Sequence, residues 1–160
     1  MNFRLRDLDF TGEQLTDILL LEIEHQLSNT DTFFYQGAKN FVHCVTTIQR
    51  ALFPNTGVAT LYEFLDLTVF AEICDSILAV ASDMASKNTT LFYIIADSMT
   101  RLQNDQETYD SVVQEAQYFQ EEFRRPQTAI VLKNYSIVCK RIIENLITTN
   151  FPNQEEELFV

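Results

Sequence analysis

The chain has 160 residues, of which 46% are hydrophobic, and a formal net charge of −12. This length is typical of one domain. The high hydrophobic fraction excludes a disordered acidic tail. An acidic surface repels phosphate backbones, which disfavours direct binding of duplex nucleic acid and favours a basic protein partner. Three glycines and three prolines leave little material for hairpins or phosphate-binding loops, so the chain is predicted to be helical.

The residues before Pro54 predict two helices. The first runs from about Thr11 to Leu27, with Thr11 as N-cap of a capping box. The second covers about 31–52, with Thr30 or Asp31 as N-cap. Its apolar residues recur at spacings of four and three, which is typical of a helix with one buried face. This apolar stripe consists of Phe34, Ala38, Phe41, Val45, Ile48 and Leu52.

The turn PNTG at 54–57 separates these helices from a shorter one. Thr60 and Glu63 have the spacing of a capping box, which predicts that the short helix begins at Thr60. A further helix is expected over residues 69–85, with an apolar stripe that starts at Val69. Because the boundary near Thr68 is weakly marked, the short helix could instead merge with this one.

Three more helices are predicted after a polar loop at 86–90. The first covers 91–102, and the second runs from about 105 to Arg124. Pro126 suits the first position of the last helix, which ends near Asn150. The sequence therefore predicts an all-α fold, a single compact bundle of five to seven helices over 1–150, followed by an acidic tail or an arbitrary end at 151–160. The residues expected in its core are Phe34, Phe41, Ile48, Phe119, Phe123 and Ile142.

No catalytic or cofactor motif is present in the sequence. It has no Walker A loop, dinucleotide fingerprint, nucleophile elbow or zinc-protease helix, so we expect neither enzyme activity nor a cofactor. Glu22 and His25 form half of a di-iron Glu-x-x-His set, but the matching acid is replaced by Asn40, so no metal site is predicted. No apolar run is long enough to span a bilayer, so membrane insertion is not expected.

The cysteines indicate a compartment. They number three, without a CxxC pair, and each lies among apolar neighbours. We expect buried, reduced thiols, which favours a cytoplasmic location. These cysteines are Cys44, Cys74 and Cys139.

The charge is unevenly distributed along the chain. Residues 60–123 hold twelve acids against two basic residues, a balance of −10, whereas 124–142 holds five basic residues and no acid. Either region is a candidate docking surface. We favour the acidic one, with a basic protein as its partner, because its charge covers a wider area; the basic one would bind an acidic protein segment. The candidate residues are Glu72, Asp75 and Asp83 in the acidic region and Arg124 and Arg125 in the basic one.

The segment DTFFYQGAKNFV at 31–42 resembles the pattern Asp-Pro-Phe-Trp-x-x-x-Ala-x-x-Leu/Phe of one known family. That pattern begins a long helix in the all-alpha domain of type IV secretion coupling proteins, the conjugative ATPases. Thr32 stands in place of the usual Pro, and Phe34 in place of the usual Trp. The segments that look like the neighbouring helices of the family are LTDILLLEIE, TLYEFLDL and VVQEAQYFQEEFRRPQTAIVLKNYSIV.

This resemblance implies a location and a class of partner. In the family, the all-alpha domain is inserted into a RecA-like hexameric motor, lies on the cytoplasmic side, lacks an ATPase motif of its own, and recognises relaxases, effectors or adaptor proteins. The resemblance implies no particular binding residues. It does imply that the two ends of the domain lie close together.

Two other classes remain open. A free-standing acidic helical protein could be an immunity or inhibitor protein that masks a basic toxin. A helical small-ligand sensor is the third class, and it would show a closed apolar tunnel with one or two polar groups. The sequence predicts no oligomeric state.

Overall fold

Seven α-helices and one 3-10 turn account for most of the described residues, which are 12–27, 32–83 and 89–150 of the computed structural model. Side chains are described in these ranges except at 12–16, 23, 26–27, 32–35, 58 and 146–150. The predicted all-α bundle is confirmed. Its elements are α1 (Gly12–Leu27), α2 (Thr32–Leu52), α3 (Val58–Phe64), α4 (Leu67–Ala81), α5 (Thr90–Arg101), η2 (Leu102–Asn104), α6 (Gln106–Arg124) and α7 (Pro126–Asn150).

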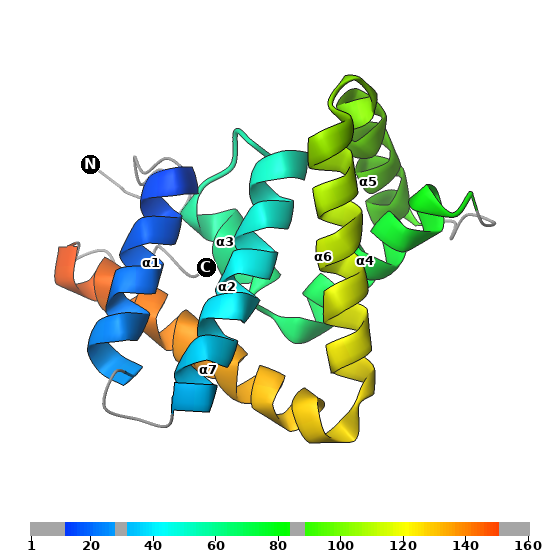
Figure 1. Ribbon diagram of the computed structural model, residues 1–160. Coiled ribbons are helices and arrows are strands. Elements are labelled where there is room, and N and C mark those ends of the chain that lie inside the picture. Colours follow the sequence, from blue (N-terminus) through cyan, green and yellow to red (C-terminus); the bar gives the residue numbers. More distant parts are fainter. Residues whose placement is uncertain (1–11, 28–31, 84–88, 151–160) are drawn as a thin grey trace.

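Helix α2 lies at the centre of the bundle (Figure 1). It packs between α1 and α6, and α7 crosses near its N-terminal end. On the far side of α6, α4 packs against both α5 and α6. Helices α2, α6 and α7 contact one another in pairs, and α6 turns into α7 at the lower right of Figure 1.

The apolar stripe predicted for α2 faces the core. From Ala38 to Leu52 each of its residues is no more than 2% exposed. Of the other predicted core residues, Phe119 and Ile142 are buried, while Phe123 is half-buried in the last turn of α6, where its ring stacks on Phe119. Phe34 lies outside the described side chains, as do the caps predicted at Thr11, Thr30 and Asp31.

The predicted start of α3 is wrong. Helix α3 begins at Val58 with Gly57 as N-cap, so the Thr60 capping box does not form. The buried side chain of Gln49 on α2 donates its amide to the carbonyl of Gly57 at 3.1 Å and to the hydroxyl of Thr56 at 3.3 Å. These tertiary hydrogen bonds tie the turn to α2 and favour a helix start directly after it.

Helix α4 also differs from its predicted range of 69–85. It starts at Leu67, because Asp66 caps it and accepts hydrogen bonds from two backbone N–H groups; α3 and α4 are therefore separate helices. It ends at Ala81, and Asp83 follows with a positive φ of 54°. Val69, predicted in the apolar stripe, is 38% exposed, because the face that α4 buries is centred on Phe70, Ile73 and Ile77.

All three cysteines are buried and free, as predicted. Burial raises the pKa of each thiol, to about 12 for Cys139. The thiol of Cys44 donates to the backbone carbonyl of Glu115 on α6 at 3.3 Å. These thiols are therefore poor nucleophiles, and their side chains pack in the core.

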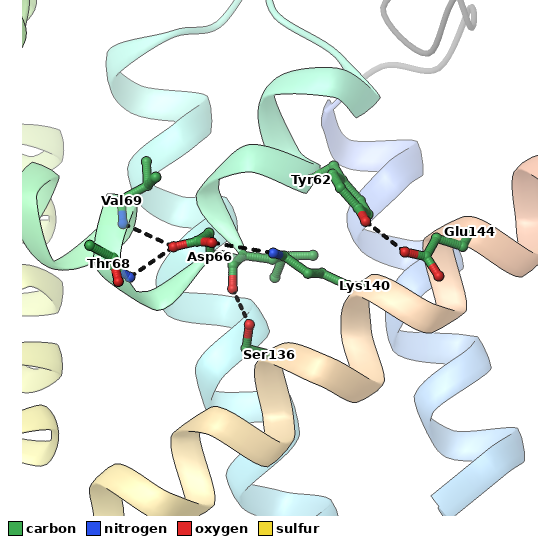
Figure 2. Close-up of polar contacts among 8 residues, drawn as sticks. Tyr62, Asp66, Thr68, Val69, Ser136, Lys140 and Glu144 are labelled. Atoms are coloured by element: carbon green, nitrogen blue, oxygen red, sulfur yellow. Dashed lines mark hydrogen bonds and ion pairs between the residues drawn. The ribbon is translucent and has the colours of Figure 1, made fainter. Parts of the chain in front are cut away.

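A polar cluster joins α7 to the corner between α3 and α4 (Figure 2). The hydroxyl of Tyr62 donates to Glu144 at 2.6 Å, and the ammonium of Lys140 lies 3.5 Å from Asp66 and 5.4 Å from the centre of the Tyr62 ring. Ser136 donates to the carbonyl of Leu65. Desolvation and the Glu144 contact raise the pKa of Tyr62 to about 12. This cluster fixes the position of α7 against the rest of the bundle.

Replacing Phe41 by Ala should lower the free energy of unfolding by about 3 kcal/mol or more, because the ring is buried and a cavity would remain. Chemical denaturation followed by circular dichroism measures the change. The matched control is Ile130→Ala, which should change stability by less than about 0.5 kcal/mol because Ile130 is exposed. Equal stability of the Phe41 variant and the unmodified chain would contradict the packing described above.

Replacing Asp66 by Asn should destabilise the protein by up to about 1 kcal/mol at neutral pH and by less in acid, since Asn still caps a helix but carries no charge. Desolvation raises the pKa of Asp66, but hydrogen bonds from Val69 and Thr68 and the charge of Lys140 outweigh it, so the pKa is lowered. A carboxyl group whose pKa is lowered by folding stabilises the fold at pH values above its unfolded-state pKa. This contribution is lost as the pH falls through the folded-state pKa.

Urea titrations of both proteins at several pH values measure this difference. Lys140→Met provides the control, because it removes the cation and should reduce the pH dependence of the same difference. The difference in the free energy of unfolding between the Asp66→Asn variant and the unmodified chain should therefore change with pH. A difference that stays constant from neutral pH to about pH 2, below the usual carboxyl range, would contradict a lowered pKa of Asp66.

Candidate functional site

The predicted basic corner is a tight turn between α6 and α7. Arg124 ends α6, Arg125 links the helices, and Pro126 begins α7. The carbonyl of Arg125 accepts hydrogen bonds from the N–H groups of Thr128 at 3.1 Å and Ala129 at 2.9 Å, and the Thr128 hydroxyl donates to the carbonyl of Glu122. These bonds hold the two arginines on the outside of the turn, where both are exposed.

A groove of about 520 Å³ runs between this corner and the N-terminal half of α2. Its floor is mostly apolar and its rim is mostly polar. Several rim residues are exposed, including Gln36, Asn40 and Gln127, so the groove opens to solvent. The floor is formed by Phe41, Cys44, Phe119, Val131, Leu132 and Tyr135, and the rim by Gln36, Asn40, Tyr118, Glu122, Arg125, Gln127 and Thr128.

The floor depends on a close approach of α7 to α2 at Gly37. A Cβ atom at this position would lie 1.9 Å from the hydroxyl oxygen of Tyr135 and 2.6 Å from its ring. The absence of a side chain therefore lets the Tyr135 ring lie against the backbone of α2. There it stacks with Phe41 at a centroid distance of 6.4 Å.

Two weak polar contacts border the groove. The Tyr118 side chain, 41% exposed, is hydrogen bonded to Asn40 of α2. Desolvation and the charge of Glu122 raise the pKa of Tyr118, so its hydroxyl stays protonated at neutral pH. Glu122 and Arg125 lie 3.8 Å apart, and the Arg125 side chain is 63% exposed. Such an exposed pair holds its partners loosely, so Arg125 is able to exchange Glu122 for another carboxylate.

The structure gives the three acidic candidates different surroundings. Glu72 and Asp83 are exposed, in the first half of α4 and just after its end. Asp75 is half-buried and accepts a hydrogen bond of 2.7 Å from the buried amide of Gln120, which also donates to the carbonyl of Ala71. The carboxylate of Asp75 therefore joins α4 to α6.

Sequence reasoning identified the basic corner but not the groove beside it. One signal was available, because glycine weakens a helix interior and also lets another element approach the helix backbone closely. Gly37 is such a residue. Its partner, Tyr135, comes from a helix nearly a hundred positions later, and no local pattern could connect the two.

The remaining candidates give no further site. Both His25 and His43 are exposed, and His43 lies 3.6 Å from Glu115. Within the described ranges, no three His, Cys, Asp or Glu side chains are grouped so as to hold a metal ion. None of the helices in that part of the chain combines the length and apolar character needed to cross a membrane.

Comparisons with protein-family models, with curated proteins and with solved structures found no match for this chain.

Replacing Gly37 by Ala should destabilise the protein by about 1–3 kcal/mol, because the added methyl group displaces the Tyr135 ring. A double-mutant cycle with Tyr135→Leu checks the cause. Leu removes the atoms that the methyl group would meet, so the double variant should lose less stability than the sum of the two single variants. Strictly additive losses in urea denaturation would show that Gly37 and Tyr135 do not approach each other as described.

Proposed function

We propose that this chain is a non-catalytic protein-interaction domain that holds a segment of a partner protein in the groove between α2, α6 and α7. The observation that supports the proposal is the position of the groove. It places an apolar floor beside the two arginines that already mark the basic end of the chain. A concave apolar site with a few polar groups is a typical binding site.

The lining of the groove indicates the chemistry of the partner segment. Tyr118 is 41% exposed and Val131 is partly exposed, so these two side chains offer apolar surface to an aliphatic or aromatic side chain. Arg125 on the rim and Arg124 beside it offer guanidinium groups to a carboxylate. The partner segment in this proposal is therefore acidic and carries at least one large apolar residue.

This proposal moves the preferred surface from the acidic region to the basic one. The sequence favoured the acidic residues because their charge covers a wider area. However, Asp75 is engaged with Gln120, whereas Arg125 is largely exposed and borders a groove. Charge then contributes mainly to the rate of association, and the apolar floor contributes to affinity.

The resemblance to the all-alpha domain of type IV secretion coupling proteins suggests a setting for such a groove. In that setting its occupant would be an acidic secretion signal or adaptor. Helix α1 packs against α7, an arrangement that the family setting would require of the first and last helices. A Walker A motif upstream in the parent open reading frame is the observation that tests this hypothesis.

An immunity or inhibitor protein is the second proposal, and exposed acids such as Glu72 and Asp83 are compatible with it. A small-ligand sensor is favoured only by the volume of the groove, which lies in the range of small-molecule sites. The groove is open and has a rim of several polar residues, in contrast to the closed tunnel expected of a sensor.

The proposed function predicts which peptides the chain selects. A random peptide library displayed on phage should yield peptides that combine an aromatic or aliphatic residue with Asp or Glu. Fluorescence anisotropy should show that Arg124→Glu with Arg125→Glu weakens binding of these peptides at least about tenfold, close to 1.4 kcal/mol. Affinity should also fall as salt rises, because exposed charges are screened over roughly 8 Å at physiological ionic strength.

Variants at the acidic candidates provide the matched control. Glu72→Lys with Asp83→Lys reverses two exposed charges and should leave the affinity of the selected peptides within about twofold. If this pair abolishes binding and the arginine pair does not, the acidic surface is the docking site and the immunity or inhibitor class gains support.

A further inference from the structure

The outward face of α7 carries two exposed apolar residues that the groove does not use. Ile130 is 69% exposed and Ile137 is 45% exposed. They lie seven residues apart, which places them on the same side of the helix roughly 10 Å from each other along its axis. The groove is lined by other α7 residues, including Val131 and Tyr135. The two isoleucines thus form a row of two apolar side chains, with the exposed Asn134 between them, on a face separate from the groove.

Basic residues flank this row. Lys133 follows Ile130 by three positions, and Arg141 follows Ile137 by four, which brings each beside an isoleucine on the helix surface. Both basic residues are exposed. No acid occurs in the sequence between Glu122 and Glu144. This face therefore combines apolar side chains with positive charge, in a chain whose net charge is −12.

The shape of the row indicates what would cover it. Residues seven apart form a ridge nearly parallel to the helix axis, which matches an apolar row on a second helix. The flanking cations are complementary to acidic residues beside that row. An extended anionic surface is a less suitable partner, because the acidic residues on the rest of the molecule would repel it. A single helix interacts only with the charges within roughly 8 Å of it.

We propose that the outward face of α7 is a second docking surface, and that its partner is an amphipathic helix whose apolar row is flanked by acidic side chains. This surface is independent of the groove, so one molecule is able to hold two protein segments at once. Ile130 and Ile137 supply the apolar contact, and Lys133 and Arg141 set the charge of the partner.

The test uses a labelled synthetic peptide of about 18 residues, roughly five helical turns, with Leu at alternating spacings of three and four and Glu on both sides of the Leu row. Fluorescence anisotropy with the full chain measures binding. We expect Ile130→Ser with Ile137→Ser to weaken binding at least about tenfold. Lys133→Glu with Arg141→Glu should weaken it similarly and reduce its dependence on salt.

The controls separate this surface from the rest of the molecule. Leu21→Ser with Ile94→Ser removes two exposed apolar residues from α1 and α5 and should leave peptide binding unchanged. Tyr118→Ala alters the rim of the groove and should also leave it unchanged, so a failure of the groove proposal does not affect this test. Circular dichroism melting curves verify that each variant is folded.

Several results would overturn the proposal. One is equal binding of a scrambled peptide with the same composition, or the absence of binding to the designed peptide. Another is self-association of the chain in sedimentation velocity that the isoleucine variant abolishes, since a second copy would then cover the face. The third is binding to vesicles that contain anionic phospholipid, lost in the same variant, since the face would then meet a membrane.

Discussion

Contacts among four aromatic rings from four helices hold the bundle together. Phe41 of α2 packs against Phe70 of α4 and Tyr135 of α7, and Phe70 meets Phe119 of α6 with ring centroids 4.7 Å apart. All four side chains are buried. Aromatic rings bury large areas and favour the edge-to-face and stacked geometries seen here, so this cluster fixes the relative positions of the helices that carry it. The groove, the basic corner and the outward face of α7 all depend on those positions.

The groove is a consequence of how α7 approaches α2. Tyr135 reaches the backbone of α2 only because residue 37 is glycine, and the polar cluster at Lys140 and Ser136 holds the next turns of α7 against the corner between α3 and α4. Since α7 is anchored along its length in this way, its first turn stays next to α6 and leaves a concave surface toward α2. The groove is thus preformed, which would reduce the cost of ordering in the binding that we propose.

The two proposed surfaces share one helix and one sign of charge. Helix α7 contributes the floor of the groove on one side and the row of Ile130 and Ile137 on the other. Its basic residues lie apart from the acidic stretch that precedes them in the chain. Several acidic residues of that stretch have structural roles in capping or packing, as Asp66, Asp75 and Asp105 show. An acidic composition therefore does not by itself place the binding site in the acidic region.

The sequence alone determined the helical class, most helix ranges and most of the core, because apolar residues at spacings of three and four define one face of a helix wherever it packs. It also identified Arg124 and Arg125 at a helix boundary, since Pro126 marks a helix start locally. The start of α4 is also a local feature, since Asp66 caps it through the N–H groups of Thr68 and Val69. Only the tertiary structure decided where α3 begins, because Gln49 of α2 holds the turn before it through a hydrogen bond that the capping pattern does not contain. The groove is of the same kind: Gly37 and Tyr135 are far apart in the chain, and only the packing of α7 on α2 brings them together.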